Sequence, residues 1–205
     1  MNKKNLLVAL SLLTLLFSNS LLAADYKEGV HYQKIALKSS RYVEGKIEVT
    51  FFYDYSNPAS LELNSHLNSW LQTLPENVYF IRRPSTLGQK NWALALSYTR
   101  AEMLGKGDDV NAALFKALNQ TPPGLNSMQE LVAFNGEQEI NGNLPTHILQ
   151  ANFKRLSSEW ADNPKITTPS IVVAQKYLIT KKMAGSDKAV INLINELIKQ
   201  ESAAK

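Results

Sequence analysis

The chain has 205 residues, of which 44% are hydrophobic and 20% are charged, as in an ordinary globular protein. Its formal net charge of +4 is too small to indicate a nucleic acid or an anionic membrane surface as its partner, and the basic doublets Arg82–Arg83 and Lys181–Lys182 are expected on the solvated surface. The sequence contains no cysteine, which excludes disulfide bonds, thiol-based catalysis and a lipid-modified start.

The first residues have the order of a secretory signal peptide. Lys3 and Lys4 form a basic start, the apolar run LLVALSLLTLLF follows, and Ala23 and Ala24 are small residues suited to cleavage. We therefore expect residues 1–23 to be a signal peptide and the mature protein to be periplasmic and free of the membrane. The apolar run is shorter than the about 20 residues of a membrane-spanning helix, and an uncleaved anchor is the alternative.

A βαβ unit is predicted next. The segment IEVTFFY at 47–53 alternates apolar and polar residues and then becomes apolar throughout, which indicates a strand that becomes buried. Apolar residues three and four positions apart predict a helix over about 58–73, and VYFIRR at 78–83 predicts a second strand that ends at Pro84. Two strands joined in this way are parallel, with a right-handed crossover.

A block of helices is predicted after this unit. Two helices are separated by Gly105, and the second begins with acidic residues, where the helix dipole favours them. The predicted elements are helices over 91–104, 108–118 and about 127–134, a loop over 135–143, and an amphipathic helix over 149–160.

The C-terminal part predicts two strands and a helix. PSIVVA at 169–174 and KYLIT at 176–180 are close enough for a hairpin that turns at Gln175. Apolar residues over 190–198 then line one face of a final helix, for which Ser186 is the predicted N-cap.

The order of the elements predicts an α/β protein with a thioredoxin fold. A βαβ piece and a ββα piece form one mixed sheet flanked by helices, and the helical block is inserted between them. We expect the thioredoxin-like domain to comprise residues 24–86 and 161–205, and the inserted helical subdomain to comprise residues 87–160.

The segment VTFFYDYSNPASL at 49–61 resembles the DsbA family of periplasmic thiol–disulfide oxidoreductases, which carry C-P-x-C at the start of this helix. Matched on Pro58, Asn57 takes the place of the attacking cysteine, Ser60 that of the resolving cysteine, and Ala59 lies between them. TTPSIVV around Pro169 is similar to the family's cis-proline loop, and the helical insertion has the same place. The resemblance implies a DsbA-like thioredoxin fold.

The chain departs from the family at the positions that carry out the family's thiol chemistry. Both cysteines are replaced, and Phe51 stands where many members have a buried acidic residue that assists proton transfer. An asparagine amide is no nucleophile, and Ser60 has no base near it in the motif. Asn57 is a favoured helix N-cap, and Pro58 suits the first helical position. We therefore predict a degenerate, redox-inactive site with no catalytic residue.

The resemblance also implies a peptide-binding site. In the family, the residue before the cis proline offers backbone groups to an extended peptide, which here points to Thr168 and Pro169, together with Asn57 and Ser60. The expected partner is an extended or unfolded polypeptide or an envelope protein, and a proline kept for folding alone is the alternative. No cofactor is expected, and His31, His66 and His147 lie too far apart in sequence to indicate a metal site.

Two other functions stay open. Kappa-class glutathione transferases and their isomerase relatives are similar in this turn, but their serine directly precedes the proline, where this chain has Asn57. The second is a structural interaction protein of an envelope assembly that makes its contacts through the helical insert. The oligomeric state is not predicted, because no extended coiled-coil pattern or exposed apolar stripe is evident.

Overall fold

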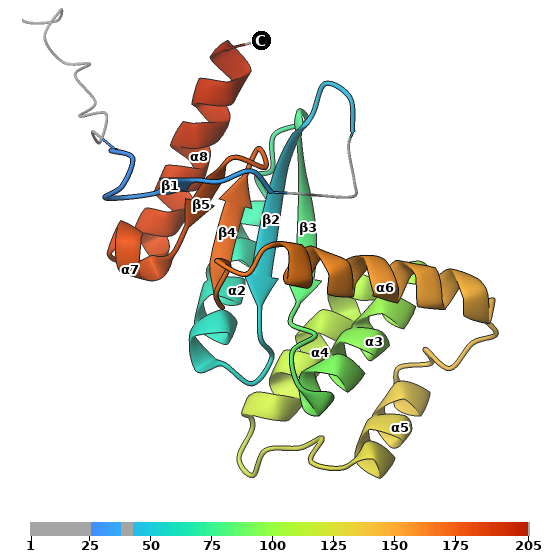
Figure 1. Cartoon of the computed structure of the whole chain (residues 1–205). Coiled ribbons are helices and arrows are strands. Elements are labelled where there is room, and N and C mark those ends of the chain that lie inside the picture. Colours follow the sequence, from blue (N-terminus) through green and yellow to red (C-terminus); the bar gives the residue numbers. More distant parts are fainter. Residues whose placement is uncertain (1–25, 38–42, 205) are drawn as a thin grey trace, which may run out of the picture.

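A computed structural model of the chain describes residues 26–37 and 43–204, and the predicted signal peptide lies outside this part. A five-stranded sheet has helices on both faces (Figure 1). The strands are β1 (Gln33–Lys34), β2 (Ile47–Tyr53), β3 (Val78–Pro84), β4 (Ser170–Val173) and β5 (Tyr177–Ile179). The helices are α2 (Pro58–Leu71), α3 (Gln89–Met103), α4 (Gly107–Asn119), α5 (Met128–Glu137), α6 (Thr146–Asp162), α7 (Lys181–Ala184) and α8 (Asp187–Ala203).

The sheet has the strand order β1-β5-β4-β2-β3 and is mixed. Strands β2 and β3 are parallel, and β2 pairs with β4 in the antiparallel sense, so the predicted βαβ unit and the predicted return of the chain to the sheet are confirmed. The hairpin of β4 and β5 is also confirmed, with positive φ at Ala174 and Gln175, as its tight turn requires. The strand β1 and the helix α7 were not predicted, because segments of two and four residues are too short to show a hydrophobic periodicity.

Strand β2 is buried on both faces, which explains its apolar composition. All seven of its residues are buried. Phe51 and Tyr53 belong to the larger core cluster, which also includes residues of α2, α4 and α8. Phe52 faces the other side, where its ring meets that of Trp160 edge to face, with the ring centroids 5.2 Å apart. The turn that follows β2 is therefore attached to a strand whose residues are all buried.

Helices α3 to α6 leave the sheet after β3 and return to it before β4 (Figure 1). The predicted helices of this block are confirmed, although α5 continues to Glu137, into the segment expected to be a loop. Helix α6 is anchored on β3, because Trp160 Nε1 donates a hydrogen bond of 2.8 Å to the Pro84 carbonyl.

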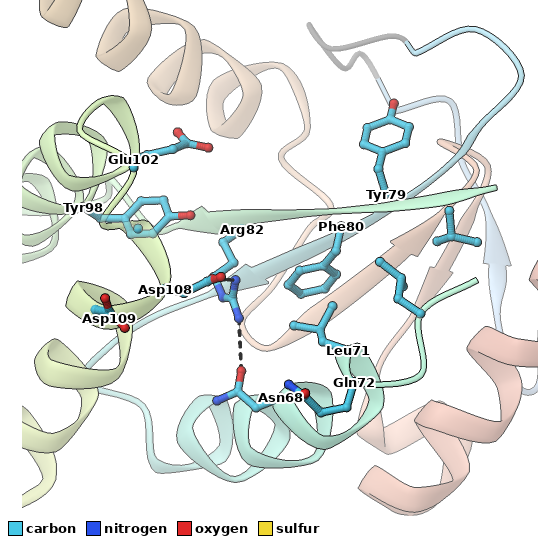
Figure 2. Close-up of a pocket in the computed structure, with 14 residues that line it drawn as sticks. Asn68, Leu71, Gln72, Tyr79, Phe80, Arg82, Tyr98, Glu102, Asp108 and Asp109 are labelled. Atoms are coloured by element: carbon cyan, nitrogen blue, oxygen red, sulfur yellow. Dashed lines mark hydrogen bonds and ion pairs between the residues drawn. The ribbon is translucent and has the colours of Figure 1, made fainter. Parts of the chain in front are cut away.

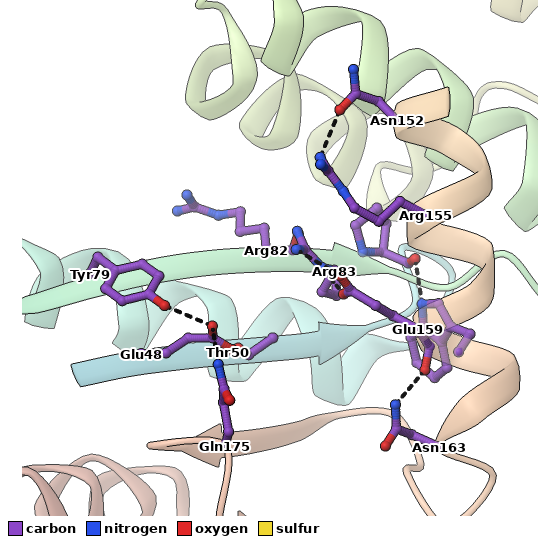
Figure 3. A network of polar contacts seen from close by, with 12 residues as sticks. Glu48, Thr50, Tyr79, Arg82, Arg83, Asn152, Arg155, Glu159, Asn163 and Gln175 are labelled. Atoms are coloured by element: carbon purple, nitrogen blue, oxygen red, sulfur yellow. Dashed lines mark hydrogen bonds and ion pairs between the residues drawn. The ribbon is translucent and has the colours of Figure 1, made fainter. Parts of the chain in front are cut away.

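The expectation that Arg82 and Arg83 lie at the surface is wrong. Both side chains are buried in β3, where Arg83 pairs with Glu159 of α6 (Figure 3). Arg82 pairs with Asp108 of α4. A buried charge is tolerated when it is paired. The partner of Arg82 is 26 residues away in the sequence and that of Arg83 is 76 residues away, so no local sequence pattern could indicate either pair. In the other doublet, Lys182 is exposed and Lys181 is half-buried.

A second polar network ties the hairpin turn to the sheet. Glu48 is buried in β2, and its carboxylate accepts hydrogen bonds from Thr50 Oγ1 at 2.6 Å, from the Tyr79 hydroxyl at 2.9 Å and from Gln175 Nε2 at 3.1 Å (Figure 3). Burial and the hydrogen bond to Glu48 raise the pKa of Tyr79, so its hydroxyl keeps its proton and stays a donor. This network lies at the start of β2, away from the turn at its end.

Within the described residues, no helix combines the length and the apolar character that crossing a membrane would require.

Candidate functional site

The turn between β2 and α2 places Asn57 at the start of the helix. Asn57 has extended backbone angles, with φ −94° and ψ 113°, and its Oδ1 accepts a hydrogen bond of 3.0 Å from the Ala59 N–H. Pro58 occupies the first helical position, where its missing N–H costs nothing. The predicted N-cap is therefore confirmed, and the side-chain oxygen of Asn57 is engaged by it.

The same side chain links this turn to a distant loop. Asn57 Nδ2 donates a hydrogen bond of 3.1 Å to the carbonyl oxygen of Thr168, which is 111 residues further along the chain. The bond between Thr168 and Pro169 is cis, as the resemblance implied. Asn57, Thr168 and Pro169 thus lie together, as expected, and one side chain joins the helix start to the proline loop.

Ser60 is fully buried beneath the turn. Its Oγ accepts a hydrogen bond of 3.2 Å from the backbone N–H of Asp54, and this holds the turn from inside. The Asp54 carboxylate is occupied by the Ser56 N–H at 2.7 Å and by Asn91 Nδ2 at 2.8 Å. In this arrangement the Ser60 hydroxyl is the acceptor that helps to hold the turn in place.

A pocket of about 580 Å³ opens beside this turn, and we call it the proline groove. Helix α2 contributes Ala59, the proline loop contributes Thr168 and Pro169, and α7 and the segment before β1 complete the walls. The lining residues are Gly29, Val30, Gln33, Ala59, Lys165, Thr167, Thr168, Pro169, Leu178, Thr180, Lys181, Lys182 and Met183. Within the described part of the chain the backbone N–H of Thr168 has no hydrogen-bond partner, so a donor stands at the groove wall.

A larger pocket, of about 730 Å³, lies at the outer edge of β3 and contains none of the predicted site residues (Figure 2). Arg82 lines it, with its guanidinium 5.0 Å from the centre of the Phe80 ring and its Nη2 donating to Asn68 Oδ1 at 3.0 Å. Glu102, Asp108 and Asp109 give this pocket an excess of negative charge. Its arginine is already held by neighbouring side chains, and its chemistry differs from that of the proline groove.

Known proteins similar to this chain point to one family. No protein-family model matches it. The thiol:disulfide interchange protein DsbA of Pseudomonas syringae is 26% identical over 208 residues, covering 98% of this chain and 97% of that protein. DsbA of Pseudomonas aeruginosa is 24% identical and covers 97% of both chains. A crystal structure of a point variant of Pseudomonas aeruginosa DsbA superposes with a TM-score of 0.74 at 25% identity, covering 87% of this chain and 100% of that one. The chain is a DsbA-like protein that lacks cysteine.

The side chains packed around the end of β2 in this DsbA-like protein are uncharged. Phe51 is fully buried and stacks on Tyr53, with their ring centroids 4.6 Å apart. The hydroxyls of Tyr53 and Tyr55 both donate to Asn111 Oδ1, at 2.8 and 3.2 Å. Burial raises the pKa of both phenols well above its ordinary value, so these groups carry no charge at neutral pH.

This cluster of Tyr53, Tyr55 and Asn111 was not predicted from the sequence. Asn111 belongs to α4, in the helical insert, and is buried against the end of β2. A buried asparagine on an otherwise apolar helix face is the one signal in the sequence that indicates a polar partner. The insert thus supplies the polar floor of the turn.

The histidines take no part in this site. His31 Nδ1 accepts a hydrogen bond of 3.0 Å from the Lys27 N–H, and His66 and His147 are exposed on α2 and α6. Across residues 26–37 and 43–204, no group of three or more histidine, aspartate or glutamate side chains is placed to hold a metal ion.

Substitution of Asn57 is expected to lower stability in two separable steps. Asn57→Ala removes both the cap and the bond to Thr168, and should lower the free energy of unfolding by about 1–2 kcal/mol. Asn57→Asp keeps an oxygen for the Ala59 N–H but loses the donor to Thr168, so its free energy of unfolding should lie between those of the unsubstituted protein and of Asn57→Ala. Urea unfolding followed by circular dichroism measures both. An unchanged midpoint for Asn57→Ala would contradict the structural role given to this side chain.

Proposed function

We propose that this DsbA-like protein is exported to the periplasm, is redox-inactive, and binds extended or unfolded polypeptide as a chaperone or adaptor of the cell envelope. The observation that carries the proposal is the proline groove. The cis proline loop, the helix start and the unpartnered Thr168 N–H lie together, whereas the cysteines are replaced by a capping amide and a buried hydroxyl.

The groove offers what an extended peptide needs. A backbone donor at its wall can pair with a peptide carbonyl, as in strand addition to a sheet, and its volume of about 580 Å³ leaves room for peptide side chains. A Proteus mirabilis DsbA in which a cysteine is replaced by serine has been solved with a non-covalently bound peptide, and it shares this fold with a TM-score of 0.65 at 21% identity, covering 86% of this chain and 100% of that one. That complex supports the proposal that a DsbA scaffold holds a peptide without a covalent bond.

The proposal is tested by comparing exchange with binding. The purified protein is expected to show no insulin reduction and no thiol oxidation, to give no saturable heat with glutathione, and to suppress the aggregation of an unfolded test protein. Absence of both peptide binding and aggregation suppression would end the proposal. Saturable glutathione binding that Asn57→Ala removes would replace it with a glutathione-dependent enzyme.

A matched pair of surface substitutions locates the binding site. Val30 lines the proline groove with 59% of its surface exposed, and Val132, on α5 of the insert, is 57% exposed. Val30→Ser should weaken peptide binding several-fold, since a contact with an apolar side chain is lost, and Val132→Ser should leave it unchanged. Fluorescence anisotropy with a labelled peptide measures both. The reverse pattern would place the contacts on the helical insert.

A further inference from the structure

The charges that the described residues bring to the proline groove are all positive. Lys165, Lys181 and Lys182 line it, and no carboxylate among residues 26–37 and 43–204 does. The larger pocket at the edge of β3 has the opposite balance, with three carboxylates and one arginine (Figure 2). Because the whole chain carries a net charge of only +4, the lysines of the groove are a local concentration of positive charge.

One of these lysines is already neutralised. Lys181 Nζ donates to Glu62 Oε2 at 2.8 Å and to Asp187 Oδ2 at 2.7 Å. The hydrogen bond to Asp187, followed by the bond to Glu62, raises the pKa of Lys181. The bond to Lys181 in turn lowers the pKa of the Glu62 carboxyl. Lys181 is thus a fixed part of the wall, and its charge is not available to a ligand.

The other two lysines are available. Lys165 and Lys182 are both exposed, and neither makes an ion pair or hydrogen bond within residues 26–37 and 43–204. They come from two separate elements, the segment that leads from α6 to Thr168 and the short helix α7. Two unpaired ammonium groups therefore border the same groove as the free Thr168 N–H.

The groove also has an apolar side. Val30 is exposed at the rim, and the side chains of Pro169 and Met183 are partly exposed in the lining. A ligand that satisfies all of these features carries carboxylates for the lysines, apolar side chains for these three residues, and a backbone carbonyl for Thr168.

We infer that the proline groove selects extended polypeptide segments in which acidic and apolar residues are interspersed. This inference rests on the proposed function and adds the class of polypeptide. Lys165 and Lys182 set the preference through charge, and Thr168 and the apolar residues bind any extended chain.

The test uses two labelled peptides of equal length and equal apolar content, one with aspartates and one with lysines at the same positions. Fluorescence anisotropy at low salt should show the acidic peptide binding about tenfold more tightly, a difference of about 1.4 kcal/mol that two exposed ion pairs can supply. Lys165→Glu/Lys182→Glu should reverse this preference, because the groove then carries two carboxylates in place of two ammonium groups. Lys154→Glu/Lys199→Glu, the same change of charge on exposed positions of α6 and α8, should leave affinity within about twofold.

Each outcome decides the matter. Equal binding of both peptides overturns the inference and leaves the proposed function standing, and binding of neither peptide overturns both. An equal loss in the control variant would assign the effect to overall charge and reject a site at Lys165 and Lys182. Co-sedimentation with phosphatidylglycerol vesicles that Lys165→Glu/Lys182→Glu abolishes, with no preference between the peptides, would assign these lysines to a membrane surface and also overturn the inference.

Discussion

Asn57→Cys/Ser60→Cys is expected to turn this protein into a thiol oxidant. The two positions are the N-cap and the third residue of α2, and the Ser60 N–H donates to the Asn57 carbonyl at 2.9 Å, so their side chains leave the same helical turn. A cysteine at a helix N-terminus has its pKa lowered from about 8.5 toward 3.5–7.5, which makes the thiolate available at neutral pH. The proline loop already lies against this position.

Thiol titration should find no free thiol in the double variant under air, and one equivalent of a reduced peptide should be oxidised. Single variants at position 57 or 60 should show no turnover, because no intramolecular disulfide can form in them. His66→Cys/Ser69→Cys provides the matched control, with the same spacing on exposed positions of α2 that lie two turns beyond the helix start and away from the proline loop. Activity no higher than in this control would show that the turn has lost more than its sulfur atoms.

The buried ion pair between Arg83 and Glu159 predicts the largest change in stability. The side chains are 5% and 6% exposed, and the guanidinium contacts both carboxylate oxygens, with Nη2 3.2 Å from Oε1 (Figure 3). Glu159→Gln keeps the shape of the side chain and leaves Arg83 with an unpaired buried charge. We expect the free energy of unfolding to fall by about 3–5 kcal/mol, a large share of the 5–15 kcal/mol of a typical domain.

Two controls separate the charge from the position. Arg83→Met/Glu159→Gln removes both charges and should recover much of the loss, because no unpaired charge is then left in the interior. Glu139→Gln breaks the surface pair with Lys106, where 82% of the Glu139 side chain is exposed, and should change stability little. A urea midpoint for Glu159→Gln equal to that of the unsubstituted protein would show that the buried pair contributes nothing.

The sequence alone was sufficient wherever the signal is local. The strand at β2, the cap at Asn57, the cap at Ser186 and the helix periods each depend on a few neighbouring residues, and each is confirmed. The thioredoxin fold followed from the order of these elements, since few topologies join them without crossing.

Long-range contacts were beyond such reasoning. The bond from Asn57 to the Thr168 carbonyl and the place of Asn111 beneath the turn both join residues more than 50 positions apart. Arginine side chains usually lie at the surface, so the burial of Arg83 could be predicted only by knowing that Glu159 pairs with it. No sequence pattern near β3 shows this. The groove itself was inferred only through resemblance to the DsbA family.

Nuclear magnetic resonance titration of the ¹⁵N-labelled protein with an extended peptide would show both where the peptide binds and whether it is changed. If the proline groove holds polypeptide without exchange, the Thr168 amide and the Asn57 side-chain NH₂ should show saturable shifts, and the peptide should be recovered chemically unchanged. Shifts confined to the edge of β3 or to the helical insert, with the signals of Thr168 and Asn57 unmoved, would show that the proline groove is not the binding site.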